Sequence, residues 1–165
     1  MQQFTKSTSQ IFDASKLKVG IVQANFSPNI TDAMVLDLQN KAKEYKIKSE
    51  NIKVINVPGA VEIPLILQTM CQINLEDTEY DREPSYDVLV AIGCVIQGDT
   101  PHFDYVCKYA CEGIMKVSLE NSIPIGFGII TVNTHDQALA RIKCGGEALE
   151  AALISWKEVE KLIGE

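Results

Sequence analysis

Several features that would point to other classes of protein are missing from this sequence of 165 residues. No run of about 18 apolar residues occurs, so no membrane-spanning helix is predicted. The N-terminal segment lacks the apolar core of a secretory signal, and a cytoplasmic location is therefore expected. Basic residues are also scarce, because 15 Lys and Arg stand against 22 Asp and Glu, for a net charge of -7. This deficit disfavours nucleic acid and membrane surfaces as partners, since both select for Lys and Arg.

Motifs for disulfide-rich, metal-binding and nucleotide-binding proteins are absent as well. The five cysteines are odd in number and include no CxxC pair, so neither a disulfide framework nor a metal site is predicted. Cys107 and Cys111 lie four residues apart and could share a ligand face of a helix, but small buried side chains are the favoured interpretation. Gly126-Phe127-Gly128 lacks the third glycine of a dinucleotide fingerprint, and no phosphate-loop GKS or GKT occurs.

What the sequence does have is a hydrophobic fraction of 46% and a regular alternation of β-rich and helical segments. Residues 18–165 are predicted to form one soluble domain, and residues 1–17 a polar tail or an edge strand. Four units of a strand followed by a helix predict an α/β fold, a four-stranded parallel sheet with helices on both faces. The predicted strands are 18–25, 52–57, 87–96 and 124–130. The predicted helices are 31–48 capped by Thr31, 60–72, one capped by Thr100, one capped by Thr134 and reaching about Gly145-Gly146, and 147–163. Residues 74–85 are predicted to be a solvated loop.

In open α/β sheets, ligands bind beyond the carboxyl ends of the strands. The loop after the third predicted strand is the most informative one here. Thr100 as N-cap would leave the free amides of a helix N-terminus to bind an anion, although the carboxylate of Asp99 opposes this. His102 would sit beside that anion, where an imidazole is suited to proton transfer. The alternative is an ordinary helix start with an incidental histidine.

Three further side chains at strand or helix ends have both a functional and a structural interpretation. Glu62 places a carboxylate at the start of an apolar helix, where it either binds hydroxyl or amide donors or only complements the helix dipole. Phe26, leaving the first strand, is either a core residue or an aromatic platform for a ring. Arg141 either favours the end of its helix or reaches a phosphate.

Four segments together resemble the 6,7-dimethyl-8-ribityllumazine synthase family. They are NFSPNITDAM, VPGAVEIPL, YDVLVAIGCVIQGDTPHFDYV and IPIGFGIIT. The similarity extends from about Lys18 to the C-terminus. The resemblance implies a three-layer, flavodoxin-like α/β sandwich. It also implies condensation of 5-amino-6-(D-ribitylamino)uracil with 3,4-dihydroxy-2-butanone 4-phosphate, without a metal or other cofactor.

The resemblance also assigns roles to individual residues. His102 matches the family's acid/base residue, and Phe26 would stack on the pyrimidine. Residues implied to bind the pyrimidine edges and ribityl chain are Ala60, Val61, Glu62, Cys94, Val95 and Ile96. Residues implied to hold the phosphate are Asp99, Thr100 and Arg141, with Lys143 as a candidate further contact. This chain departs from the family's usual residues at Ser27, Val61, Gln97 and Asp99, and its loop after Arg141 is shorter than the family's.

The family's sites form between subunits of a pentamer, so Phe127 and Arg141 would come from a neighbouring subunit. The resemblance thus implies a homo-oligomer, either a pentamer or an assembly of pentamers, and it makes riboflavin synthase a candidate protein partner. Two alternatives on the same scaffold are a non-catalytic flavin- or lumazine-binding protein and a subunit of a purely structural shell.

Overall fold

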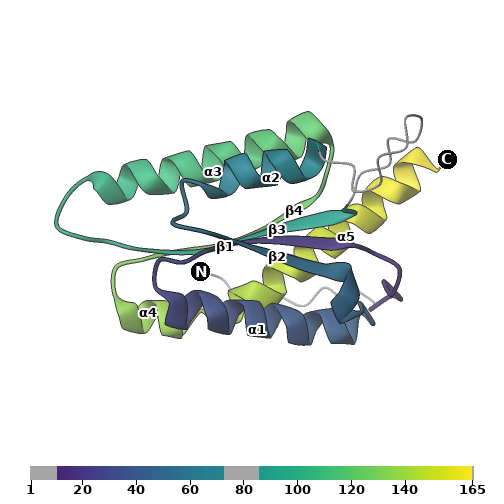
Figure 1. Ribbon diagram of the computed structural model, residues 1–165, viewed down its shortest axis with the longest axis horizontal. Coiled ribbons are helices and arrows are strands. Elements are labelled where there is room, and N and C mark those ends of the chain that lie inside the picture. Colours follow the sequence, from purple (N-terminus) through teal and green to yellow (C-terminus); the bar gives the residue numbers. More distant parts are fainter. Residues whose placement is uncertain (1–10, 73–85, 165) are drawn as a thin grey trace.

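The structure, a computed structural model, describes residues 11–72 and 86–164. Its centre is a four-stranded sheet in the order β2-β1-β3-β4, in which every neighbouring pair is parallel (Figure 1). The strands are β1 Val19–Ala24, β2 Ile52–Val57, β3 Val88–Ile96 and β4 Ile125–Val132. The helices are α1 Pro28–Glu44, α2 Ile63–Gln72, α3 His102–Asn121, α4 His135–Leu139 and α5 Cys144–Ile163, with a short 3-10 turn at Ser49–Asn51. The predicted loop at 74–85 lies outside the described residues.

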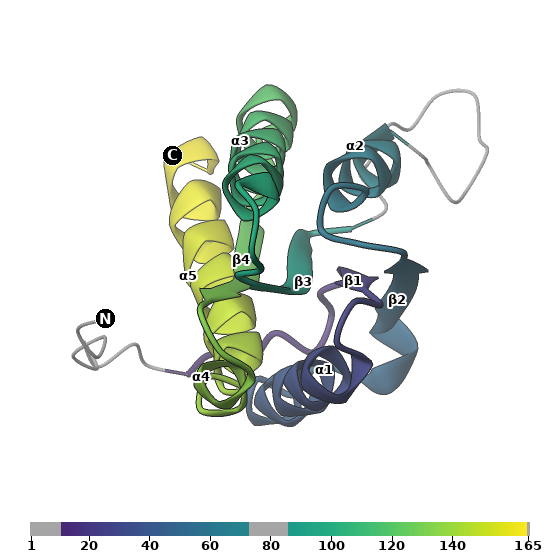
Figure 2. The same ribbon diagram turned by 90° about the vertical axis from the view of Figure 1, so that its left-hand side faces the viewer.

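The helices form two layers, one on each face of the sheet (Figure 2). One core cluster joins α1 and α5 to the sheet, and a second cluster joins α2 and α3 to the opposite face. Every residue of β1 and each of the first seven residues of β3 is buried, as in strands covered on both faces. The predicted three-layer α/β architecture, with a four-stranded parallel sheet, is confirmed.

The two N-caps predicted for α1 and α3 are wrong. α1 begins at Pro28, and Thr31 is a buried residue inside the helix instead of its cap. α3 begins at His102 with Pro101 in the N-cap position and no side chain capping it, so Thr100 does not have the predicted capping role. In both places a proline precedes or opens the helix, because its ring already holds φ near the helical value.

The Gly145-Gly146 pair was predicted to interrupt or end a helix, and this prediction is also wrong. Both glycines lie in the first turn of α5, where α5 crosses α1. A Cβ at Gly145 would collide with the backbone carbonyl of Met34, and one at Gly146 would lie 2.7 Å from Asp37 Oδ2. The amide of Gly146 donates to the same carboxylate at 2.8 Å. The pair therefore allows two helices to approach closely.

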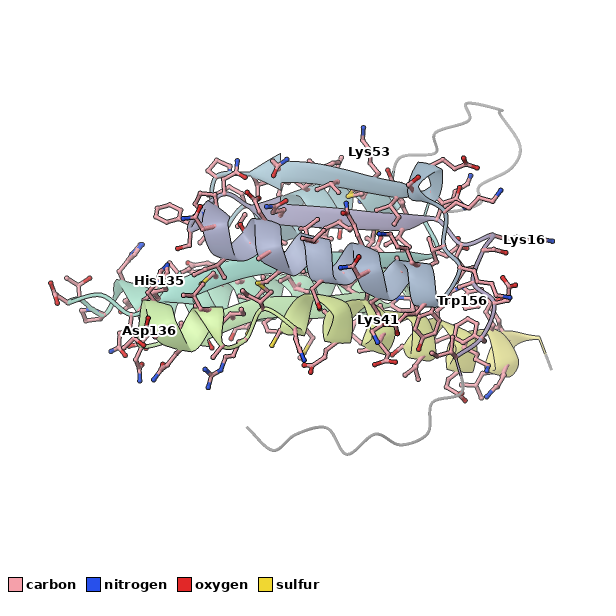
Figure 3. The ribbon with its side chains drawn as sticks, turned by 90° about the horizontal axis from the view of Figure 1, so that it is seen from below. Lys16, Lys41, Lys53, His135, Asp136 and Trp156 are labelled. Carbon is pink, nitrogen blue, oxygen red and sulfur yellow. The ribbon has the colours of Figure 1, made fainter. Side chains whose placement is uncertain are left out.

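Residues 11–17 form neither helix nor strand, and Phe12, Ala14 and Leu17 pack in the core cluster shared with α1 and α5. Phe12 stacks on Trp156, with ring centroids 6.3 Å apart, and meets the Tyr45 ring edge-on at 5.4 Å. Trp156 lies at the end of the molecule opposite to His135 (Figure 3). This part of the N-terminal segment is therefore anchored at the amino-terminal edge of the sheet.

No described helix is long and apolar enough to cross a membrane.

Candidate functional site

The carboxyl ends of the four parallel strands meet at one edge of the sheet, which faces the viewer in Figure 2. β1 and β2 end level with each other, since Ala24 is paired with Val57, and the amide of Asn25 extends the ladder to Val57 O at 2.8 Å. β3 and β4 end together at Ile96 and Val132. Because Gln23 of β1 pairs with Ile92, β3 continues past the end of β1. The result is a step in the sheet edge, formed on its taller side by Cys94–Ile96.

The turn after β2 brings two of the predicted site residues together. A Cβ built at Gly59 would lie 3.2 Å from Glu62 Oε2 and 3.6 Å from Phe26 Cδ2, so the carboxylate and the ring both lie close to this glycine. Phe26 is 71% exposed, which excludes the interpretation of this ring as a core residue of the single chain. An exposed ring beside an exposed carboxylate is an arrangement that can stack on a flat heterocycle and accept hydrogen bonds from its polar substituents.

The same turn explains why α2 begins later than predicted. Residues 60–62 form a turn, and the helix begins at Ile63. Ile63 is fully buried. Its side chain lies over the step, since a Cβ built at Gly93 of β3 would be 3.5 Å from Ile63 Cδ1 and 3.6 Å from the Cβ of Ala24, the last residue of β1. Ala60 is buried beside it, whereas Val61 is 45% exposed and Glu62 is exposed. The buried residues anchor the turn, and the exposed ones face solvent at the strand ends.

The end of β3 presents its side chains alternately to the two faces. Cys94 is buried in the cluster with α1 and α5, and burial raises the pKa of its thiol. Val95 packs against the opposite cluster, and Ile96 is partly buried on the Cys94 side. The backbone of this segment, together with its partly buried side chains, is what the step offers to a ligand.

The β3–α3 connection is open to solvent. Asp99, Thr100 and His102 are all exposed, and His102 is the first residue of α3, at the carboxyl-terminal edge. The first amides of a helix have no partner within it, and an α-helix of 20 residues carries a positive partial charge at this end. The predicted anion site thus retains its helix N-terminus, although no side chain caps it.

Three other predicted site residues lie apart from this cluster within one chain. Phe127 is 45% exposed on the edge strand β4, five residues before the end of the strand, which is roughly 16 Å along it. The capping prediction for α4 is confirmed, because Gln137 N donates to Thr134 Oγ1, but the helix ends at Leu139 and Arg141 lies in the following turn. The Arg141 guanidinium donates from Nη1 to Gln137 O at 2.7 Å.

Arg141 also lies on the other face of the sheet from His102. The residues around it, Ala138 and Ile142, belong to the cluster of α1 and α5, whereas α3 covers the opposite face. Lys143 is exposed at the start of α5. A single chain therefore collects Phe26, the 60–62 turn and His102 at one edge, but it does not bring Phe127 or Arg141 to them.

A polar cluster between β1 and α1, formed by Gln23, Thr31 and Asp32, was not predicted from the sequence. Gln23 is only 4% exposed, and its Nε2 donates to Asp32 Oδ1 at 2.6 Å and to Thr31 Oγ1 at 3.3 Å. Between Phe26 and α1, Ser27 has a φ of 55°, in the left-handed region. One signal was available in the sequence, since Gln23 is the only polar side chain in the apolar strand VGIVQA.

Two further observations concern possible sites elsewhere in the described residues. Among the described residues, no group of three or more His, Cys, Asp or Glu side chains is arranged to hold a metal ion. A cavity of about 350 Å³ lies at the opposite edge of the sheet, where Asp87 and Pro124 precede β3 and β4, and Trp156 and Ile163 of α5 line it. None of the predicted site residues lines this cavity.

Comparison with known proteins gives a consistent result. Residues 16–159 match the family model of 6,7-dimethyl-8-ribityllumazine synthase. Over 149 residues, 89% of each chain, the sequence is 36% identical to a 6,7-dimethyl-8-ribityllumazine synthase of Desulfovibrio desulfuricans. Among solved structures, a 4-deoxy-L-threo-5-hexosulose-uronate ketol-isomerase complexed with a tartrate is similar at a TM-score of 0.35 and 12% identity, over 88% of this chain and 74% of that one. A TM-score of that size does not indicate a common fold.

Proposed function

Because this chain belongs to the 6,7-dimethyl-8-ribityllumazine synthase family, we propose that it condenses 5-amino-6-(D-ribitylamino)uracil with 3,4-dihydroxy-2-butanone 4-phosphate. The products are 6,7-dimethyl-8-ribityllumazine, inorganic phosphate and two molecules of water. The chain is accordingly a transferase of riboflavin biosynthesis, and the cytoplasm is its proposed location. The observation that supports this assignment most directly is that Phe26 and Glu62, which lie close to each other, and His102 all belong to the carboxyl-terminal edge of the sheet.

The pyrimidine is proposed to bind at the step between β1 and β3. Its ring would stack on the exposed face of Phe26, and the Glu62 carboxylate beside that ring would accept hydrogen bonds from ribityl hydroxyls. The backbone of residues 60–62 and 94–96 would bind the polar edges of the ring. A rigid sheet edge suits this task, because holding two reactants in register supplies much of the rate enhancement of a condensation.

The ketone phosphate is proposed to lie next to the N-terminus of α3. Its phosphate would accept from backbone amides near Asp99 and from the Thr100 hydroxyl, where the helix dipole favours a negative charge. His102, in the first helical position, would then stand beside the carbon skeleton. It would transfer protons in three steps: imine formation, in which the 5-amino group adds to the ketone and water leaves, elimination of phosphate, and ring closure by the ribitylamino nitrogen with loss of the second water.

Completion of the site by a neighbouring subunit is the second part of the proposal. Within one chain, Phe127 lies far from the carboxyl ends of the strands, and Arg141 lies on the face of the sheet opposite to His102. In a cyclic homo-oligomer, a pentamer or an assembly of pentamers, a different surface of the neighbour would bring these two residues, with Lys143, to the site. The guanidinium of Arg141 would then bind the phosphate in a bidentate manner.

Exposed apolar side chains support such an assembly. Tyr105, Tyr109, Met115 and Leu119 of α3 and Leu65 of α2 are all more than 60% exposed in the single chain. Apolar side chains gathered on two neighbouring helices are typical of a surface that is covered by another protein.

The experiment combines the purified protein with both substrates and follows the absorbance of the lumazine product. Light scattering on the same sample gives the size of the assembly. We expect product formation well above the uncatalysed rate, from particles larger than one chain. Formation of product at the uncatalysed rate would contradict the proposed function, and binding of flavin or lumazine by such a protein would favour the non-catalytic alternative.

A further inference from the structure

Phe26 is the ring on which the proposed pyrimidine site depends, yet little of the chain holds it in place. With 71% of its surface exposed, the side chain cannot be oriented by core packing. Its direction must therefore be determined by the backbone on either side. A binding platform is effective when its geometry is set before the ligand arrives, since ordering it on binding costs affinity.

On the strand side, that backbone is held by the sheet. Ala24 is the last residue of β1, and the amide of Asn25 donates to Val57 O at 2.8 Å. On the helix side, Ser27 O accepts from the amides of Ile30 at 2.9 Å and Thr31 at 3.2 Å. Ser27 thus connects Phe26, at the end of the strand segment, to the first turn of α1.

Ser27 has φ 55° and ψ 59°, a left-handed conformation that residues with a Cβ rarely adopt. The following residue, Pro28, sterically disfavours the right-handed helical conformation at Ser27. The usual extended conformation of an N-cap residue would send the chain in another direction at Phe26. The left-handed turn is thus the specific feature by which β1 enters α1 while Phe26 points into solvent.

The start of α1 is in turn locked to β1. Gln23, buried in the strand, donates to Asp32 Oδ1 at 2.6 Å and to Thr31 Oγ1 at 3.3 Å. These bonds link the strand three residues before Phe26 with the first turns of the helix that follows Ser27. The backbone is therefore fixed both before and after Phe26. The end of β1 and the start of α1 stay at a constant separation, which the backbone of Ser27 has to bridge.

We propose that Ser27 is a positioning residue, whose left-handed backbone conformation aims the Phe26 ring at the pyrimidine. This inference rests on the proposed function, because it takes the pyrimidine as the ligand of that ring. It predicts that pyrimidine binding requires a residue at position 27 that tolerates a positive φ, and that it does not require the hydroxyl group of Ser27. Asparagine, the residue other than glycine most tolerant of this conformation, should replace it, whereas β-branched residues should not.

The experiment compares steady-state kinetics of the full-length protein and three variants. In Ser27→Val, we expect the KM for the aminopyrimidine to rise about tenfold, with kcat and the KM for the ketone phosphate within about twofold of wild type, as for loss of uniform binding. Ser27→Asn should keep the KM of the wild type. Ser27→Thr retains the hydroxyl but is β-branched, so it should shift the KM in the same direction as Ser27→Val.

Ser122 provides a matched control, because it is also a serine in the left-handed region, with φ 52°, but lies at the C-cap of α3 and the opposite edge of the sheet. Ser122→Val should lower thermal stability about as much as Ser27→Val while leaving the KM for the aminopyrimidine unchanged. An equal rise in KM in both valine variants would overturn the inference. So would a higher KM in Ser27→Asn, since a hydroxyl contact would then be the better explanation.

Calorimetric titration with the aminopyrimidine alone separates this inference from the proposed function. If the wild type binds the pyrimidine but forms no product, the condensation is contradicted, and the Kd of the four proteins still tests the inference by the same comparison. A crystal structure with a negative φ at residue 27 overturns the inference whatever the activity. If Ser27→Val does not fold, the comparison of Ser27→Thr with Ser27→Asn carries the same test.

Discussion

Gln23 Nε2 lies 2.6 Å from Asp32 Oδ1 and joins the interior of the sheet to the first turns of α1. A buried amide of this kind is stabilising only while its donors are paired. We expect Gln23→Leu to lower the free energy of unfolding by about 1–3 kcal/mol, since Thr31 and Asp32 lose their partner in the strand. Chemical denaturation at a constant protein concentration measures this change.

Gln68→Leu is the matched control for that prediction. Gln68 Oε1 accepts from Asn121 Nδ2 at 3.0 Å between α2 and α3, but the pair is only partly buried. A smaller loss of stability is expected there. An equal or larger loss in Gln68→Leu would show that burial of the Gln23 cluster is not what makes it important.

His102 and Arg141 lie on opposite faces of the sheet within one chain, which leads to a complementation experiment. His102→Ala should slow turnover by about 10²–10⁴-fold with pyrimidine binding largely intact, because a proton-transfer group is lost. Arg141→Ala should also be nearly inactive. If each site takes these residues from two subunits, mixed oligomers formed from equal amounts of both variants should recover about a quarter of the wild-type activity.

The measurement is lumazine formation after the two variants are unfolded and refolded together. Variants that are refolded separately and then combined serve as the control, and they should remain inactive. Mixed oligomers without activity would indicate that both residues act within one chain. Unchanged turnover in His102→Ala would remove this residue from the mechanism.

Gly145 permits the close crossing of α1 and α5. In Gly145→Ala, the new methyl group would collide with the backbone carbonyl of Met34, which cannot move without shifting α1. We expect a loss of about 1–3 kcal/mol in the free energy of unfolding, as for other overpacked substitutions. Gly98→Ala is the control, because a Cβ at Gly98 has no neighbour within 4 Å. Equal stability of the two variants would contradict this account.

Asp13 gives the N-terminal segment a dependence on pH. Hydrogen bonds from the Ser15 side chain and amide, with a further one from Lys46, lower the pKa of Asp13 to about 2. A carboxyl whose pKa is lower in the folded state stabilises that state above its unfolded pKa, and loses this effect as the pH falls through the folded value. The docking of residues 11–17 should therefore weaken between about pH 4 and pH 2.

Trp156 reports on this change, since it is the only tryptophan and stacks on Phe12. Its fluorescence should change over that pH range in the wild type and much less in Asp13→Asn. A fluorescence profile that is the same in both proteins would exclude Asp13 as the origin of the pH dependence.

The α/β layering was predictable because it depends on local patterns. β3 is a nearly continuous apolar segment, and the spacing of apolar residues marks the helices, so neither needs information from distant residues. The candidate site was predictable to the same extent, since parallel strands bring their carboxyl ends to one edge whatever the details. Helix boundaries were less accurate, because Pro28 and Pro101 compete with nearby hydroxyl residues for the start of a helix.

What the sequence by itself determined is thus the order of strands and helices along the chain, the edge of the sheet at which the candidate site lies and, through the resemblance of its motifs, the family. Only the tertiary structure decided how far apart the site residues lie. It placed Phe26 beside Glu62, left Arg141 on the other face from His102, and brought Gly145 against Met34. The physical reason is that propensity and periodicity act over a few residues. Contacts between residues far apart in sequence, and a left-handed residue such as Ser27, depend on how the packed layers meet.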